Sequence, residues 1–259
     1  MSLLRGLVVQ SEVVHAVFMR ETRTRFGQYR MGYLWAIADP AIVILTIAGF
    51  FALVNRAAPY GMDIYSFIAT GIIPYKLFAS SAQQVGESVN GNRALLFYPR
   101  VLPIDLALAR GLFELATYAA VFIVLMGLHG LYFQQLVVDE ALYVIAGLTL
   151  ASLLGTATGL VFCAIGVMSR TADRARGPLL RPLFWISGIF FTVDALPAHV
   201  RPLAGLNPVI HCAELVRSGW FVSYEDTYVD TSYVCLWILG LSVLGLILER
   251  HVRRKIEVA

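Results

Sequence analysis

The sequence carries little charge for its length, since Asp, Glu, Lys and Arg make up only 14% of its 259 residues. An ordinary soluble domain has about 25% charged residues. Apolar residues make up 58% of the chain, and its mean hydropathy is +0.72. A soluble fold of this size cannot bury so much apolar surface, which excludes soluble enzymes and disordered chains. The small net charge of +3 indicates no nucleic-acid partner.

Motifs for nucleotide, metal and nucleophilic chemistry are also missing. The chain has two lysines, Lys76 and Lys255, and neither follows a GxxxxG loop, so it has no P-loop for ATP. The three cysteines, Cys163, Cys212 and Cys235, form no CxxC pair, which predicts neither a disulfide framework nor a zinc site. No Ser-His-Asp spacing, HExxH motif or pair of intramembrane aspartates occurs. The sequence therefore predicts no catalytic residue, no metal and no cofactor in this chain.

Long apolar runs dominate what is present. About 20 apolar residues are needed to cross a hydrocarbon core about 30 Å thick. Six stretches meet or approach this length, which predicts an all-α membrane protein with six transmembrane helices. The predicted spans are Gly32–Val54, Ile64–Val85, Pro103–Leu128, Leu142–Met168, a shorter one at Leu179–Leu196, and Thr231–Leu248.

The positions of the basic residues predict the orientation. Most of the 20 Lys and Arg residues lie in the N-terminal segment, in the loops after the second and fourth spans, and in the tail 249–259. The opposite side carries only Arg56, Arg201 and Arg217. By the positive-inside rule both termini are cytoplasmic. Residues 1–31 form an amphipathic interface helix, or alternatively a poorly ordered lead-in, before a single membrane domain at 32–259.

One outer segment, at about 198–224, is apolar but interrupted by Pro202, Gly205 and Pro208. After Pro208, apolar residues recur at helical spacing up to Trp220. This pattern predicts short re-entrant helices before the last span, shielded by protein. The alternative is an amphipathic helix that lies on the membrane surface.

The second predicted span carries a polar stripe. At 100° per residue its members fall within about 60° of one another. Lys76 lies near mid-membrane, where a charge costs about 2.5–3.5 kcal/mol and normally faces a bundle interior or a wet path. This indicates a translocation path, although Lys76 is alternatively a structural partner for an acid such as Asp39. The stripe consists of Tyr65, Lys76, Ser80, Gln83 and Glu87.

Two further spans contribute candidate path residues. In the first span Trp35, Asp39 and Phe50 share one face, and Asp39 serves either the path or the scaffold. In the fifth span Phe184 and Phe191 share a face. Sugars stack on aromatic rings, so polar and aromatic walls suit a glycan better than an ion.

The loop between the second and third spans, at 88–103, is short and basic but contains apolar residues. Exposed apolar residues on a cytoplasmic face indicate a docking element for another protein. The alternative is a linker that lies along the membrane. The candidate docking residues are Asn90, Asn92, Arg93, Leu95 and Phe97.

Three motifs resemble those of permeases in the polysaccharide-export class of ABC transporters, and most closely those for capsular polysaccharide. The motifs are RETRTRFGQYRMGYLWAIADP at 20–40, YPRVLPID at 98–105 and NPVIHCAELVR at 207–217. The first motif is long and specific, whereas the other two are weak alone. Asp39 stands where the resemblance leads us to expect a glutamate, a change that keeps the charge.

The resemblance implies a homodimer in the bacterial inner membrane, paired with two copies of a separate ABC ATPase that binds ATP and magnesium. It implies export of a lipid-linked polysaccharide along a path between the two permeases. The N-terminal helix and the loop 88–99 would contact the ATPase. A periplasmic adaptor and an outer-membrane channel would complete the route.

Two other classes of function stay open at this point. A related permease would export O-antigen, teichoic acid or a drug with the same architecture. A membrane-embedded lipid-processing enzyme would instead need a clustered acid or metal motif, and none is found in the sequence.

Overall fold

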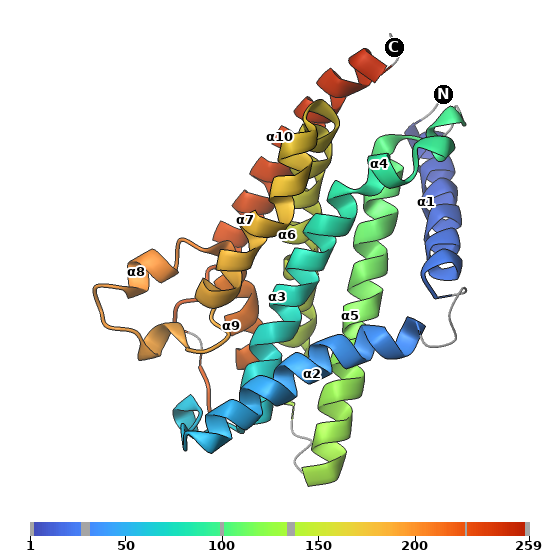
Figure 1. Ribbon diagram of the computed structural model, residues 1–259. Coiled ribbons are helices and arrows are strands. Elements are labelled where there is room, and N and C mark those ends of the chain that lie inside the picture. Colours follow the sequence, from blue (N-terminus) through green and yellow to red (C-terminus); the bar gives the residue numbers. More distant parts are fainter. Residues whose placement is uncertain (1–2, 27–31, 99–100, 134–137, 226, 257–259) are drawn as a thin grey trace.

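A computed structural model describes the chain apart from its extreme ends and four internal gaps. In the described part the chain forms helices joined by turns, without a strand (Figure 1). The described ranges are 3–26, 32–98, 101–133, 138–225 and 227–256.

Eight long helices and five short ones make up these ranges. The long helices are α1 (Leu3–Phe26), α2 (Gly32–Leu53), α3 (Ile64–Gly86), α5 (Pro103–Phe133), α6 (Ala141–Met168), α7 (Arg170–Ile186), α9 (Pro208–Trp220) and α10 (Thr231–Ile256). The short ones are η1 (Pro59–Gly61), α4 (Ser88–Gly91), η2 (Arg93–Phe97), η3 (Val193–Ala195) and α8 (Arg201–Ala204).

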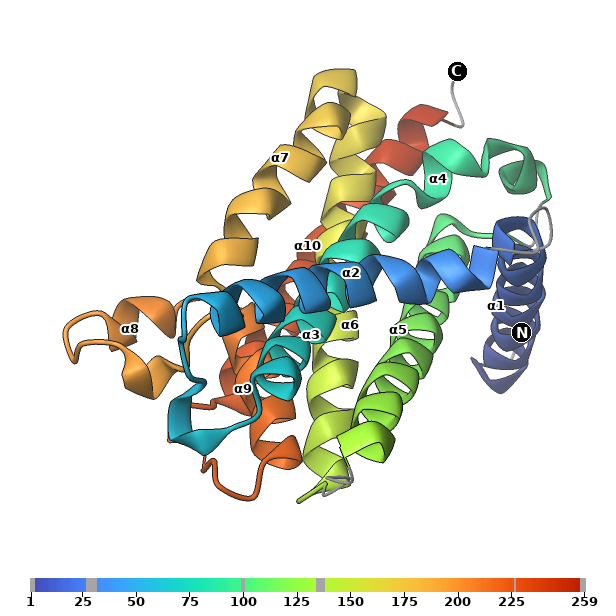
Figure 2. The same cartoon turned by 60° about the horizontal axis from the view of Figure 1, so that its bottom comes forward.

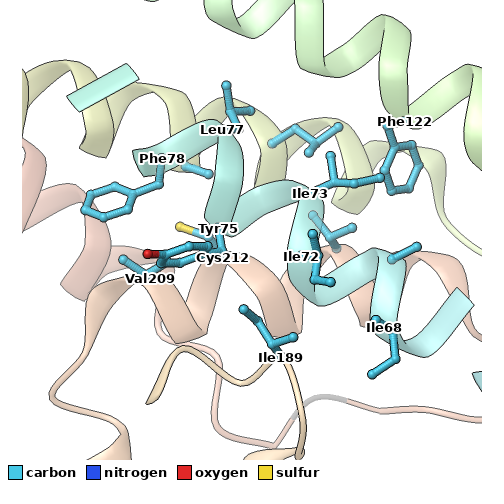
Figure 3. Close-up of a cluster of buried hydrophobic side chains, with 14 of the residues drawn as sticks. Ile68, Ile72, Ile73, Tyr75, Leu77, Phe78, Phe122, Ile189, Val209 and Cys212 are labelled. Atoms are coloured by element: carbon cyan, nitrogen blue, oxygen red, sulfur yellow. The ribbon is translucent and has the colours of Figure 1, made fainter. Parts of the chain in front are cut away.

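Helix α3 lies at the centre of the bundle and packs against α2, α5, α6 and α9 (Figure 1). Its side chains Ile68, Ile72 and Ile73 are fully buried, with Phe122 of α5 and Ile189 among their neighbours in the same cluster (Figure 3). The helix begins at a capped end, where the Asp63 carboxylate accepts a hydrogen bond from the Ser66 backbone N–H. Since protein rather than lipid surrounds α3, it can carry more polar residues than its neighbours.

Close packing between α3 and α6 depends on Gly155 and Gly159 of α6, which are four residues apart and form a GxxxG motif. A Cβ atom added to Gly155 would lie 2.7 Å from the Ser81 Cβ, and one added to Gly159 would lie 2.6 Å from the Val85 Cβ. Helices in lipid associate through such close backbone approach rather than through the hydrophobic effect. The small residues therefore set the distance between the two central helices.

Within the described ranges, four helices are long and apolar enough to cross a membrane. These are α2, α5, α6 and α10. Their starts agree with those of the first, third, fourth and sixth predicted spans, and α3 agrees with the second, whereas α5 and α10 end later than predicted, at Phe133 and Ile256. Helix α2 crosses α3 and α5 at a steep angle in both views, whereas α3, α5 and α6 run along the bundle (Figure 1, Figure 2).

The predicted fifth span at 179–196 is wrong as a continuous helix. Helix α7 begins earlier, at Arg170, and ends at Ile186. Gly188 then adopts φ +74°, a left-handed conformation that glycine accepts without steric cost. Its carbonyl accepts a hydrogen bond from the Arg217 Nη2 at 2.8 Å. The helix thus ends two residues before a left-handed glycine whose carbonyl faces the buried Arg217.

The apolar segment at 198–224 contains two helices, as the sequence predicts. Every residue from Val209 to Trp220 in α9 is buried, against α6, α3 and α10. An amphipathic helix on a surface would leave one face open, so that alternative is wrong. Asn207 caps α9 by accepting the Val209 backbone N–H, and Pro208 occupies its first position. The depth of α9 in the membrane stays a prediction.

Helix α1 packs along α5 at the end of the bundle where α10 also ends (Figure 1). A small apolar cluster of Val17, Leu106 and Ala109 joins the two helices, and Leu95 and Leu96 of η2 cover it. Residues 3–26 are thus attached to the domain that the sequence placed after them. Their position in a membrane interface stays a prediction.

Candidate functional site

Helix α2 exposes one continuous face. Trp35, Asp39 and Phe50 lie on it, as the sequence predicts. Trp35 and Phe50 are each 63% exposed, and the side chain of Asp39 is also 63% exposed. Ile42 and Leu53 lie on the same face and are also exposed. The face is mostly apolar; its exposed polar side chains are Thr46 and Asp39, the latter about two turns from the start of the helix.

Lys76 of α3 forms an ion pair with this carboxylate. Its Nζ donates a hydrogen bond to the Asp39 Oδ2, and the Lys76 side chain is only 18% exposed. Pro40, next in the chain, is buried against the bundle, so α2 presents Asp39 at the point of contact with α3. The two predicted candidates are therefore brought together, with the ammonium turned inward and the carboxylate partly open to the outside.

The other members of the α3 stripe have different surroundings. The Tyr65 ring stacks on His129 of α5, with centroids 4.3 Å apart and planes 10° apart. The Ser80 Oγ donates a hydrogen bond of 2.6 Å to the Glu114 Oε2 of α5. Gln83 and Glu87 are exposed. The stripe is thus covered by α2 and α5 along most of its length and open towards the end of α3 nearest α4.

Aromatic residues gather where α7 ends. Phe184 packs edge to face on Tyr75, Trp185 and Phe190. Phe190 also stacks on Phe51 of α2, with centroids 6.4 Å apart. Phe184 is half-buried within this cluster, and Trp185 is its most exposed member, at 66%. The second predicted aromatic, Phe191, is half-buried in the turn after α7.

The predicted docking residues are partly used inside the molecule. Asn92 is buried, accepts a hydrogen bond of 3.0 Å from the Arg20 Nη1 of α1, and donates one to the Ser88 carbonyl. Leu95 covers the α1–α5 cluster, and Asn90 donates to the Asp173 Oδ1 of α7 at 3.4 Å. Asn92 and Leu95 were predicted to dock another protein, but they face inward, where they fix α1 against α5. The side chains of Arg93 and Phe97 lie outside the described residues.

Polar contacts between α1 and the rest of the chain escaped the sequence prediction. The Arg110 Nε lies 3.1 Å from the Glu21 Oε1, and its Nη1 donates to the Gln84 carbonyl. The Gln10 amide donates to Asp105 at the start of α5. Glu114, one turn away on α5, is the partner that helical spacing favours for Arg110, and no local pattern points to Glu21.

A buried charged cluster beside α9 also escaped prediction. Arg217 is fully buried, and its Nη1 donates a hydrogen bond of 2.7 Å to the Glu214 Oε1. The guanidinium also lies 4.3 Å from the centre of the Phe67 ring of α3. Tyr224 donates its hydroxyl to the Glu214 Oε2. The charges at positions 214 and 217 are three residues apart, which was the only signal that they pair.

In the described ranges no three His, Cys, Asp or Glu side chains could hold a metal ion together. The polar groups described above hold helices together or line open faces.

The profile of the ABC-2 type transporter family matches residues 12–221. The chain is 32% identical over 248 residues to the polysialic acid transport protein KpsM of Escherichia coli, covering 95% of both chains. It is 27% identical to the capsule polysaccharide export inner-membrane protein CtrC of Neisseria meningitidis serogroup B, covering 99% of this chain and 97% of the relative. It is 26% identical to BexB of Haemophilus influenzae, which has the same description, covering 98% and 96%.

Proposed function

This chain belongs to the ABC-2 type transporter family, and from that premise we propose that it is the permease of a capsular polysaccharide exporter. It would move a lipid-linked polysaccharide across the bacterial inner membrane, in a complex with two copies of an ABC ATPase. Names of relatives from three genera, each matched over nearly its whole length, support the substrate class. A periplasmic adaptor and an outer-membrane channel would receive the polymer, and both termini would be cytoplasmic.

One observation supports the position of the path: the Asp39 side chain is 63% exposed on the mostly apolar helix α2. An ionised group in the hydrocarbon region is expensive unless it faces protein or water. Its pairing with Lys76 reduces this cost but leaves the outward side of the carboxylate uncovered. The exposed face of α2 therefore borders a wet path or a second subunit rather than lipid.

A second copy of the chain would close the path. The exposed faces of α2 in two subunits would form opposite walls, with Trp35 and Phe50 as aromatic surfaces and the Asp39–Lys76 pair between them. The open end of the α3 stripe at Gln83 and Glu87 would form the cytoplasmic entrance. The aromatic cluster around Phe184 would line the path further out.

The ATPase would bind where α1, α4 and η2 meet. Asn90 and the loop 88–99 would form this contact, although Asn92 and Leu95 face inward. Ala94 is exposed and Tyr98 is 64% exposed, so these side chains are free to reach a partner. Cysteines at positions 94 and 98 should crosslink to the ATPase, whereas a cysteine at the inward-facing position 95 should crosslink poorly. Crosslinking only to lipid or to the adaptor at all three positions would contradict this contact.

Deletion of the gene in its own host tests the function. Cells that lack the permease should keep the lipid-linked polymer in the cytoplasm, and the wild-type gene should restore surface polysaccharide. Retention of O-antigen, teichoic acid or a drug instead would select one of the related exporters. Product formation from a lipid substrate by the isolated chain would support the membrane enzyme.

A further inference from the structure

An open polar pocket of about 510 Å³ lies apart from the α2 face, at the end of the bundle opposite α1. Four separate segments form it: η1, η3, α8 and the turn after α9. Its lining is Tyr60, Asp194, Arg201, Val222, Ser223, Tyr224, Glu225 and Thr227.

Two tyrosines form an aromatic wall of this pocket. The Tyr60 and Tyr224 rings have centroids 5.4 Å apart, and Tyr60 is 52% exposed. Tyr60 adopts φ +57° and ψ +23°, a left-handed conformation that is uncommon for a bulky residue. Strained backbone of this kind persists where the surroundings require it, often at ligand sites. The conformation places a large ring at the pocket mouth.

The polar wall is held rigidly in place. Arg201 donates to the carbonyls of Asp194 and Leu196, both at 2.8 Å, and to the Tyr228 hydroxyl at 3.1 Å. The Thr227 hydroxyl lies 3.2 Å from both Asp194 carboxylate oxygens. These contacts fix a carboxylate, a guanidinium and hydroxyl groups around one space before any ligand arrives.

The pocket floor is connected to the buried charged cluster. Tyr224 is 4% exposed, and its hydroxyl is bonded to Glu214, which pairs with Arg217. Burial, followed by the neighbouring Asp194, raises the pKa of Tyr60 above its ordinary value. The phenol is protonated at neutral pH with or without this shift and can donate a hydrogen bond. In this aromatic wall, Tyr224 is thus anchored to the buried charged cluster, and the Tyr60 hydroxyl is able to donate a hydrogen bond.

We propose that this pocket binds a sugar residue of the polysaccharide as it leaves the membrane. This inference rests on the proposed function and adds a binding subsite to it. A sugar ring has an apolar face that packs on Tyr60, while its hydroxyl groups bond to Asp194 and Arg201. The lining has two carboxylates and one guanidinium, so it favours hydroxyl groups over the phosphate of a lipid headgroup.

Protection of a cysteine tests occupancy in cells. Ser223 lines the pocket and is exposed, while His199 is exposed outside it and serves as the matched control. With Cys235 changed to Ser, the two remaining native cysteines are buried. A water-soluble maleimide should label the Ser223→Cys variant more slowly in cells that make the polysaccharide than in cells whose glycan synthesis is blocked. The His199→Cys variant should be labelled equally in both.

Equal labelling of the Ser223→Cys variant in both cells, with export intact, would overturn the pocket and leave the proposed function standing. Protection that persists without glycan and disappears without the periplasmic adaptor would also overturn it, because a protein would then occupy the pocket. Absence of polysaccharide export in wild-type cells would instead contradict the proposed function itself.

A substitution at Tyr60 gives a second test of the sugar-binding pocket. Glycine accepts the left-handed conformation at this position, so Tyr60→Gly removes the ring without straining the turn. Export by this variant should fall about three- to tenfold, the size expected for one aromatic contact, with unchanged protein level. Tyr60→Phe keeps the ring and should export more than Tyr60→Gly. Wild-type export by Tyr60→Gly would overturn the proposal.

Discussion

At the scale of single residues, the Lys76–Asp39 pair links α2 to α3. Lys76→Met keeps most of the side-chain stem and removes its charge. We expect this variant to lose at most about 1 kcal/mol of stability, since the Asp39 side chain that loses its partner is 63% exposed. Polysaccharide export should fall as well. Folded protein can be measured by size-exclusion chromatography in detergent, and export by surface glycan staining.

The double variant Lys76→Met, Asp39→Asn separates stability from transport. Removing both charges avoids leaving one of them unpaired, so the amount of folded protein should recover. Export should stay low if the pair borders the path. Recovery of both properties together would show that the pair is purely structural, and normal export by Lys76→Met alone would contradict either role.

Arg217 is the most deeply placed charge in the described part of the chain. Its removal leaves the Glu214 carboxylate buried without its guanidinium, which costs about 3–5 kcal/mol. Arg217→Met should therefore prevent accumulation of folded protein. Arg217→Lys should also destabilise the protein, because one ammonium group cannot replace the planar guanidinium group, which hydrogen-bonds to Glu214 and Gly188 together.

The exposed Arg174 is the matched control for this prediction. Arg174→Met removes the same charge from the surface of α7 and should leave the midpoint of thermal unfolding within a few degrees of the wild type. Equal loss of folded protein in both variants would contradict a special structural role for Arg217.

At the scale of helices, the small residues of α6 decide how closely α3 can approach. Gly155→Ala places a methyl group against the backbone of Phe78 and the Ser81 side chain. Overpacking of this kind costs about 1–3 kcal/mol. Gly240→Ala in α10 is the control, since nothing lies within 4 Å of the added atom. Thermal unfolding in detergent should separate the two variants, and an equal midpoint would refute the close contact.

At the scale of the whole molecule, the chain should depend on another subunit for energy. No P-loop occurs in its sequence, so the purified chain should bind no ATP with micromolar affinity. ATP hydrolysis should appear only after the partner ATPase is added. Isothermal titration of ATP into the purified chain is the direct measurement, and saturable binding would contradict the prediction.

The helices themselves could be read from the sequence because apolar run length is a local property. Helices α2, α3, α5, α6 and α10 begin within a few residues of the predicted starts of their spans. The exposed face of α2 was also predictable, since Trp35, Asp39 and Phe50 recur at helical spacing. The fifth span failed because Gly188 turns the chain to meet Arg217, and that partner lies 29 residues further along.

Composition, apolar run length and motifs are local properties, and they were enough to identify a helical membrane permease whose sequence has no P-loop. The pairing of Lys76 with Asp39 was one alternative that the sequence offered, and the structure confirms this contact. The contacts of Arg110 with the distant Glu21, of Asn92 with Arg20, and of the segments around the Tyr60 pocket appeared only in the folded chain. Each of them joins elements far apart in the chain, and their approach depends on how all the helices pack together.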